Sequence, residues 1–280
     1  MEQRRSSDSR MFPAGFFLCG LLPVILFFPI PDRAVAEPSA AALAAFNSHI
    51  GGVESRIVEQ HRSQSGFLAW VNSAGQSEMR LRRGELIVEQ LTPSTDADLP
   101  GAMLHDWRGT AFAPGAKAAD FERLMKGFSA YPQHFSPQVV QAKVLSQKGD
   151  RFQVLMRVRQ KHVITVVMDT AYDVSFGRLD AAHGYSISRS TQISEIEAPG
   201  TENERTLKPG ENHGFLWRLN TYWSYEERDG GLYMQIESIS LTRSIPTGLG
   251  WLIGPFVKSV PRESLEFTLQ SACDALKGIP

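Results

Sequence analysis

Hydrophobic and polar positions alternate along much of the chain after residue 138. Apolar residues recur at every second position in Phe152–Gln160, and before Asp229-Gly230-Gly231 the residues Trp217, Leu219, Thr221, Trp223 and Tyr225 share one face of an alternating run. Tyr185–Glu197 is predicted to be a further strand. A period of two is typical of a β-strand with one buried face, and an Asp-Gly pair between two such runs indicates a tight hairpin turn. This part of the chain is therefore predicted to form a series of antiparallel strands.

Three segments have helical periodicity instead. The first covers Pro38 to Gln64, the second covers Ala118–Phe128 and the third covers Pro261–Lys277. In the first, apolar residues recur at spacings of three and four, which places them on one stripe of a helix. They are Leu43, Phe46, Ile50, Val53 and Ile57. The stripe is compatible with packing on the chain's own sheet or on a partner or membrane.

Between the first helix and the main run of strands, the pattern predicts three short strands. They are Phe67–Val71, Glu78–Arg82 and Glu85–Leu91. A polar, proline-containing loop follows at Thr92–Gly101, where we place a domain boundary. The predicted organisation is a segment at 37–101 with a helix and short strands, and a main domain at 102–280.

The first 36 residues have the features of an export signal. Arg4, Arg5 and Arg10 precede an apolar core of 16 residues, Gly15–Ile30, and Ala34-Val35-Ala36 offers a cleavage site. The core is shorter than the roughly 20 residues of a membrane span, although an uncleaved anchor remains an alternative. We expect a periplasmic or secreted protein.

Charge and cysteine content narrow the possible partners. The formal net charge is −1, which argues against a nucleic-acid partner because phosphates require a basic surface. After removal of the signal only Cys273 remains, so no internal disulfide is expected. We expect a monomer held together by its apolar core.

The sequence contains no recognisable catalytic or metal-binding motif. No two of the seven histidines have the His-x-x-x-His spacing, and there is no Gly-x-Ser-x-Gly element. We therefore expect no metal, no cofactor and no catalytic residue. Cys273 lies on the apolar stripe of the last predicted helix and is interpreted as a core thiol.

The order of the predicted elements indicates an α+β fold. A strand and a helix come first, a long antiparallel sheet follows, and one long C-terminal helix closes the chain. A curved sheet wrapped around such a helix leaves space for an apolar ligand between them. The predicted apolar wall comprises Phe128, Met156, Trp223, Met234, Trp251 and Phe256.

Polar residues within the alternating runs are candidates for orienting that ligand. They are Arg189, Arg218, Asn220, Tyr222, Glu237 and Arg243. Each charged residue among them either faces solvent or requires a partner, because an unpaired buried charge is costly. Glu237 is the one candidate for an acid or base. The glycine-containing segment Thr247–Phe256 is predicted to form an apolar lip at the mouth of the cavity.

Two segments resemble a known superfamily. Asp106-Trp107-Arg108-Gly109 through YPQHFSPQVVQAKVLSQKGDRFQV resembles the opening of START-like (SRPBCC) proteins, which include polyketide cyclases and coenzyme Q-binding proteins. IPTGLGWLIGPFVKSVPRESLEFTL resembles the approach to their C-terminal helix. The resemblance covers about 102–277 and implies a helix-grip fold with a deep apolar cavity. Members bind lipids, sterols, quinones or polyketides, and a minority are enzymes.

The sequence thus favours an exported protein that binds a hydrophobic small molecule. The first alternative is a cyclase- or hydrolase-type enzyme acting on an aromatic or polyketide-like substrate, which would need an acid or base in the cavity. The second is an interaction module whose N-terminal helix docks on a membrane or a partner protein.

Overall fold

A computed structural model describes residues 37–63, 66–70, 74–92, 99, 101–161, 164–244 and 250–278, without the side chains of 74 and 250–258. The predicted export signal lies outside the described residues. None of the described helices is long and apolar enough to cross a membrane.

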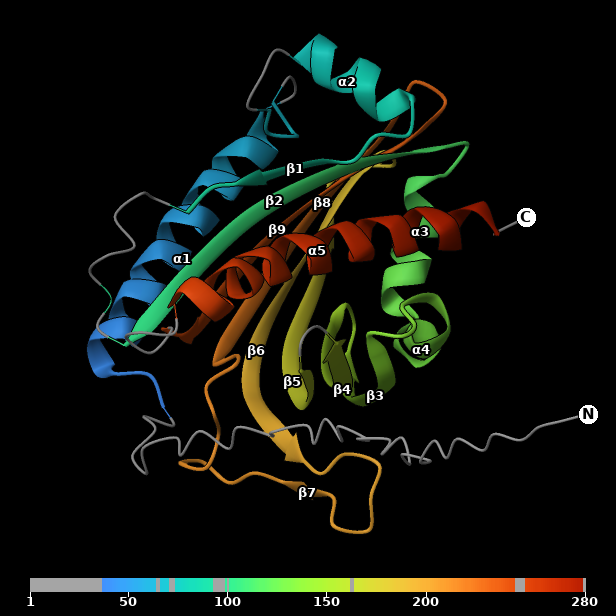
Figure 1. Cartoon of the computed structure of the whole chain (residues 1–280). Helices are drawn as coiled ribbons and strands as arrows, with labels where there is room; N and C mark the ends of the chain where they lie inside the picture. Colours follow the sequence, from blue (N-terminus) through green and yellow to red (C-terminus); the bar gives the residue numbers. More distant parts are fainter. Residues whose placement is uncertain are drawn as a thin grey trace, which may run out of the picture. The chain divides into compact units, whose positions relative to one another are not determined.

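The described strands form one antiparallel sheet, shown in Figure 1. Its order is β1-β2-β9-β8-β6-β5-β4-β3, with the short β7 paired to β6. The strands are β1 (Ile87–Gln90), β2 (Ala102–Pro114), β3 (Val139–Lys148), β4 (Arg151–Lys161), β5 (Thr165–Arg178), β6 (His183–Glu197), β7 (Arg205–Thr206), β8 (Arg218–Arg228) and β9 (Gly231–Arg243). Strand β9 pairs with β2, so the first long strand and the last one lie side by side.

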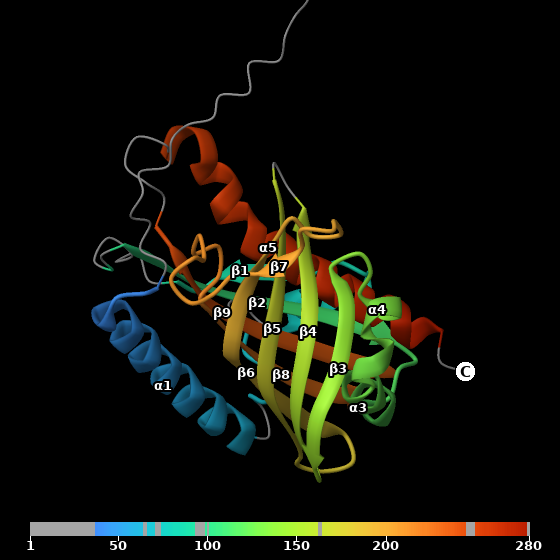
Figure 2. The ribbon, with the colours of Figure 1, turned by 90° about the horizontal axis from the view of Figure 1, so that it is seen from below.

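Helices cover both faces of this sheet, as Figure 2 shows for α1 and α5. They are α1 (Ala40–Arg62), α2 (Ala74–Arg82), α3 (Ala118–Lys126), the 3-10 helix η2 (Phe128–Ala130), α4 (Tyr131–His134) and α5 (Gly250–Lys277). The face that packs against α5, α3 and α4 is called the α5 face. The opposite face, covered by α1 and α2, is called the α1 face.

The sequence pattern predicted much of this architecture. The α+β helix-grip arrangement is confirmed, because a long C-terminal helix lies across an antiparallel sheet. Helix α1 is confirmed as well, with Phe46, Ile50, Val53 and Ile57 buried against the sheet. In the β8–β9 turn, Asp229 and Gly230 have φ values of 57° and 75°. Both values are positive, as a two-residue hairpin turn requires.

Three local predictions are wrong. The described part of the predicted strand Phe67–Val71, residues 67–70, forms no strand. Glu78–Arg82 belongs to helix α2 and not to a strand: Leu81 is fully buried while Met79 is exposed, so the two do not share a strand face. The last helix begins at Gly250, well before Pro261, so Pro255 and Pro261 lie inside it. The predicted lip is therefore partly helix, and its first three residues, Thr247–Leu249, lie outside the described residues.

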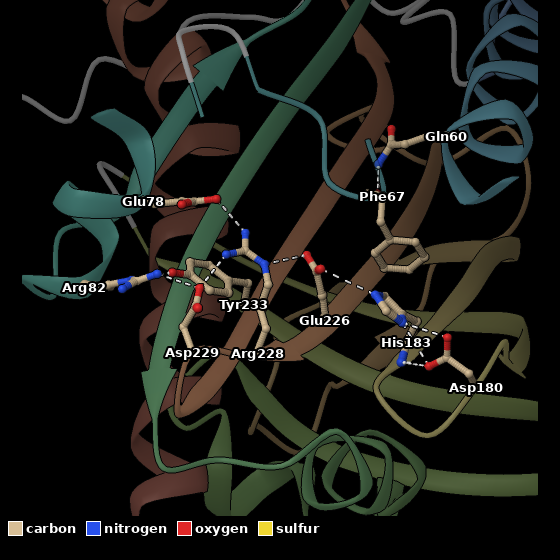
Figure 3. Close-up of polar contacts among 10 residues, drawn as sticks. All are labelled: Gln60, Phe67, Glu78, Arg82, Asp180, His183, Glu226, Arg228, Asp229 and Tyr233. Carbon is tan, nitrogen blue, oxygen red and sulfur yellow. Dashed lines mark hydrogen bonds and ion pairs between the residues drawn. The ribbon is translucent and has the colours of Figure 1, made fainter. Parts of the chain in front are cut away.

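Helix α2 is fixed to the β8–β9 turn by a network of charged side chains, drawn in Figure 3. Arg228 donates to Glu78 at 2.7 Å and to Asp229 at 2.6 Å, and its guanidinium lies 4.1 Å from the centre of the Tyr233 ring. Arg82 donates to the Tyr233 hydroxyl at 2.7 Å. Residues more than a hundred positions apart are thus joined, and the N-terminal segment is held on the α1 face.

Candidate ligand-binding face

The two faces of the central strands differ sharply in chemistry. On β2 the α5 face carries Met103, His105, Trp107, Gly109, Ala111 and Ala113. On β9 it carries Leu232, Met234, Ile236, Ser238, Ser240 and Thr242. The charged residues of these two strands, Asp106, Arg108, Glu237 and Arg243, fall on the α1 face because successive side chains of a strand alternate. The α5 faces of β2 and β9 therefore carry no charged side chain, whereas Glu227 of β8 lies on the same face, where it accepts a hydrogen bond from the Ala118 amide at 2.9 Å.

Burial changes along the α5 face. Near α3 and α4 it is fully packed, with Phe121 lying 5.2 Å from Trp223 and 5.0 Å from Tyr225 between ring centres. Toward the other end of the strands the side chains are only half-buried. These half-buried residues include Met103, Trp107, Ser188, Leu219, Thr221 and Ser238. The α5 face is thus fully packed at one end, and partly exposed apolar and hydroxyl side chains lie at the other end.

Helix α5 is seated on β2 at the boundary between these two regions. A Cβ atom on Gly109 would lie 2.6 Å from Leu269 and 3.1 Å from Leu265, so only glycine allows the helix to come this close. On the same face, several strands away from β2, Ser264 of α5 accepts a hydrogen bond from Gln160 of β4 at 3.1 Å. The helix therefore bridges the sheet from β2 to β4.

His105 is the titratable group in the middle of this face. Its side chain is buried, and burial lowers the pKa of His105 to about 4, so the imidazole is neutral near pH 7. Its Nε2 lies 3.2 Å from the Thr242 hydroxyl. Nearby, the indole Nε1–H of Trp107 is buried and has no hydrogen-bond partner among the described residues.

The structure divides the predicted ligand-binding residues between the two faces. Trp223 and Met234 lie on the α5 face, within the main core. Asn220, Tyr222 and Glu237 lie on the α1 face, because they alternate with residues such as Trp223 along β8 and β9. Glu237 therefore cannot serve as an acid or base between the sheet and α5, and this correction removes the only candidate the sequence offered for that role.

Glu237 is instead part of a buried polar cluster beneath α1. It pairs with Arg56 of α1, and Arg108 of β2 donates to it at 3.3 Å. Burial and the nearby Asp106 raise the pKa of Glu237. Asp106 in turn accepts a hydrogen bond from His49 of α1 at 2.7 Å. These contacts attach the N-terminal helix to the sheet and have no access to the α5 face.

Most of the remaining predicted residues are also on the α1 side. Arg189 donates to Glu54 of α1 at 2.6 Å, and Tyr222 donates to the same carboxylate at 2.8 Å. Arg218 and Arg243 pair in register with Leu241 and Ala102, which face α1. The side chains of Trp251 and Phe256 lie outside the described part of the chain, although their backbone belongs to α5.

Three other features were considered as sites: clusters of metal-ligating residues, the thiol of Cys273 and a surface depression. Among the described residues, no group of three or more His, Cys, Asp or Glu is placed to hold a metal ion. Cys273 is buried on α5, and burial raises the pKa of its thiol to about 11, which keeps it protonated. A half-open depression of about 400 Å³ near the β3–β4 turn is lined by Lys148, Asp150, Arg151, Ser175, Phe176, Tyr185 and Ile187.

Similar proteins were found among solved structures. No family model and no curated protein matches the sequence. Among solved structures, a START superfamily protein from Mycobacterium smegmatis is 15% identical, with a TM-score of 0.41 over 61% of this chain and 97% of that one. A STAR-related lipid transfer protein fragment from Xanthomonas axonopodis is also 15% identical, with a TM-score of 0.40 over 66% and 98%. The Zhui aromatase/cyclase from Streptomyces sp. R1128 is 12% identical, with a TM-score of 0.42 over 62% and 94%.

The chain is similar to these START-like structures, and its helix-grip fold is shown by the strand order and by the packing of α5 on β2. The resemblance of the two sequence segments points to the same group of structures. Similarity at this level concerns the path of the chain only. What the START-like domain binds has to be argued from its own side chains.

Sequence reasoning missed the polar groups that do lie on the α5 face. Ser186, Ser188 and Ser190 occupy every second position of β6, and Thr221 and Ser238 continue the hydroxyl groups onto β8 and β9. The signal was the repeat Ser-x-Ser-x-Ser inside a strand that otherwise alternates. It was overlooked because serine is usually a surface residue and charged residues looked like better ligand contacts.

Proposed function

We propose that the START-like domain binds a neutral hydrophobic small molecule between α5 and the half-buried end of the α5 face. The observation that carries the proposal is the absence of charged side chains from the part of this face that β2 and β9 form. The described α5-face residues of β2 and β9 from Met103 to Ala113 and from Leu232 to Thr242 include no carboxylate, amine or guanidinium. A charged ligand would lose its hydration here without finding a counter-ion.

The energetics agree with an apolar ligand. Burial of apolar surface contributes roughly 25 cal/mol per Å² removed from water, so the half-buried Met103, Trp107 and Leu219 offer surface that a ligand can cover. The neutral hydroxyl groups beside them can fix its orientation. Because the fully packed end near α3 leaves no such surface, we place the ligand at the opposite end, next to the N-terminal half of α5.

We further propose that this binding takes place outside the cytoplasm and without chemistry on the ligand. The support for export is the basic, apolar and small-residue order of the first 36 residues. Support for a non-catalytic role comes from the neutral face: His105 is its central titratable group, and a histidine with a pKa of about 4 is a poor general base near pH 7.

Native mass spectrometry of the protein purified from its own exporting cells tests the proposal, followed by solvent extraction of whatever is bound. The proposal predicts a reproducible extra mass that is extracted into organic solvent and carries no net charge at pH 7. The variant Thr221→Trp places a bulky ring on the half-buried end of the α5 face. It should block the site, so the purified variant should lack the extra mass. An extracted ligand that is an acid or an amine would contradict the proposal, as would equal occupancy of the variant.

A further inference from the structure

The hairpin formed by β3 and β4 concentrates positive charge. Together the two strands contain six basic residues and no acidic one. The basic residues are Lys143, Lys148, Arg151, Arg157, Arg159 and Lys161. Because the whole chain has a formal net charge of −1, this concentration of positive charge is local. We call residues 139–161 the basic hairpin.

The basic side chains of the hairpin lie on the side of the sheet that faces away from α5. On β4 they alternate with Phe152 and Val154, which are buried in the core against α5. The register of β3 places Lys143 and Lys148 opposite outward-facing residues of β4. In Figure 2 the hairpin lies in front of α5, and none of the described helices crosses its near side. Solvent therefore reaches this side of the hairpin.

Five of the six cations have no ion-pair partner among the described residues. Arg157 is the exception, since it pairs with Asp169 of β5 at 2.7 Å and with Glu204 at 2.6 Å. The other five side chains are exposed. Asp150, in the turn of the hairpin, accepts a hydrogen bond from Lys126 of α3 at 2.6 Å. Ion pairs of the described chain therefore leave most of the charge of the hairpin unbalanced.

Lys148 and Arg151 lie directly opposite each other next to the turn of the hairpin. Like charges at opposed positions of an antiparallel pair are destabilising, and an anion bound between them would remove the repulsion. Both residues line the depression of about 400 Å³, together with Ser175 and Tyr185, whose hydroxyl groups can donate hydrogen bonds. The hairpin thus ends beside a hollow whose cations and donors match one phosphate-bearing group.

The apolar side chains exposed on the hairpin are few and aliphatic. Val144, Leu145 and Leu155 are 38%, 53% and 36% exposed, whereas Phe152, the one aromatic residue of the two strands, is buried in the core. The core of a protein–protein interface is typically enriched in aromatic residues and depleted in lysine. Cations beside aliphatic side chains are instead typical of a surface that binds an anionic membrane.

We infer that the basic hairpin binds the surface of a lipid bilayer that contains anionic phospholipids. The five unpaired cations bind lipid phosphates, and one headgroup lies between Lys148 and Arg151 in the depression. This surface lies on the side of the sheet opposite the α5 face. The inference therefore does not depend on the proposed function.

Vesicle co-sedimentation tests this surface, with protein purified from its own exporting cells. Vesicles of phosphatidylcholine alone are compared with vesicles that also contain phosphatidylglycerol. Each cation at an anionic surface contributes about a fivefold gain in affinity, so the phosphatidylglycerol vesicles should bind the protein at least about a hundredfold more tightly. The preference should disappear in about 1 M salt, where charges interact over only about 3 Å.

A variant with five substitutions assigns the preference to the basic hairpin. It removes the unpaired cations by Lys143→Gln, Lys148→Gln, Arg151→Gln, Arg159→Gln and Lys161→Gln. Its affinity for phosphatidylglycerol vesicles should fall by at least about a hundredfold, while its affinity for phosphatidylcholine vesicles should not change. Circular dichroism confirms that the variant is folded.

The matched control makes the same change in net charge elsewhere on the surface. It carries Arg62→Gln, Arg80→Gln, Arg83→Gln, Lys208→Gln and Arg262→Gln, all at exposed positions. Its affinity for phosphatidylglycerol vesicles should stay within about fivefold of the wild type. Residues 1–36 are the same in all three proteins, so a contribution from them to vesicle binding cancels in the comparison.

Two results would overturn the inference. The first is equal affinity of the hairpin variant and the control variant for phosphatidylglycerol vesicles, because the attraction would then depend on net charge and not on the hairpin. The second is binding of wild-type protein to poly-L-glutamate but to neither kind of vesicle, with loss of that binding in the hairpin variant. That result would assign the basic hairpin to an acidic protein partner instead of a membrane.

Discussion

Tyr222 and Trp223 are consecutive residues of β8 that belong to different layers of the protein. The Tyr222 hydroxyl donates to Glu54 of α1 at 2.8 Å, while the Trp223 ring packs 5.2 Å from Phe121 of α3 on the other side of the sheet. The same alternation along β2 and β9 places their charged side chains on the α1 face and leaves none on the α5 face. It follows that a substitution can be directed at one face with the other left intact.

Glu237→Gln tests the structural role of the α1 face. The substitution keeps the shape of the side chain but removes the charge that pairs with Arg56 and Arg108. Since both the carboxylate and Arg108 are buried, we expect the free energy of unfolding to fall by about 2 kcal/mol, measured by urea denaturation. Ligand affinity should be unchanged. Reduced affinity in a folded variant would contradict the assignment of Glu237 to the α1 face.

Glu85→Gln is the control for that experiment. Glu85 accepts from Arg80 at 2.8 Å, but both side chains are about half exposed to solvent. Exposed ion pairs contribute little because water screens them. No measurable change in the free energy of unfolding is expected.

The stability of the α1 contact should depend on pH through His49. The hydrogen bond to Asp106 raises the pKa of His49 above its ordinary value of 6.5, with Glu237 acting in the same direction and burial and Arg56 opposing it. A raised folded-state pKa stabilises the folded protein below the unfolded pKa, and this contribution is lost as pH rises through the folded pKa. The difference in unfolding free energy between wild type and His49→Gln should therefore be largest below pH 6.5 and shrink as the pH rises through the folded-state pKa of His49.

The His49 titration itself can be followed by NMR. We expect the imidazole resonance of His49 to shift with a pKa above 6.5, and to return to an ordinary value in Asp106→Asn. A His49 pKa at or below 6.5 in the wild type would contradict the pairing with Asp106.

His61 should have the opposite effect. It lies near the end of α1, where its Nε2 is 2.8 Å from the Ser224 hydroxyl and its ring stacks on Phe67. Burial lowers the pKa of His61 to about 4. A lowered pKa means that the unfolded chain binds the proton first, so stability falls as pH falls from 6.5 toward 4. His61→Phe keeps the ring and removes the titration. Its stability should fall less over this interval, and an equal fall would contradict the assignment.

Alternation alone predicted which residues share a strand face, but not what covers each face. Arg218, Asn220 and Tyr222 alternate with Trp223 along the sequence, and the structure places them on the α1 face and Trp223 on the α5 face. A period of two predicts one buried face only. In the structure α1 covers the second face as well, and the contact between α1 and β9 joins residues nearly two hundred positions apart, which a local pattern cannot reveal.

Helix boundaries near glycine and proline were the other difficulty. Gly250, Gly254 and Pro255 indicated a loop, because glycine and proline lower helix propensity, yet they lie in the first part of α5. The short segment Glu78–Arg82 is compatible with a strand by its alternation and with a helix by its composition. In the structure it is helical, and Leu81 packs against Tyr233. In both places tertiary packing outweighed local preference.

Gly109 and Gly52 should respond oppositely to alanine. At Gly109 the new methyl group would lie 2.6 Å from Leu269, so α5 or the leucine must shift, and we expect a loss of about 1–3 kcal/mol. Gly52 lies within α1 with nothing within 4 Å of an added Cβ atom, and Gly52→Ala should stabilise by about 0.5–1 kcal/mol. Chemical denaturation measures both. A neutral Gly109→Ala would show that α5 is not seated on β2 as described.

The central claim is that the ligand occupies the neutral face and not the charged one. The most direct measurement is ligand affinity, by equilibrium dialysis of the extracted ligand, in Thr221→Trp and Tyr222→Phe. These neighbouring positions of β8 face α5 and α1 respectively. The account predicts that Thr221→Trp abolishes binding. Tyr222→Phe, which loses the hydrogen bonds to Glu54 and Asn220 on the α1 face, should bind like the wild type. Binding that survives in folded Thr221→Trp and is lost in Tyr222→Phe would place the ligand beneath α1 and contradict the account.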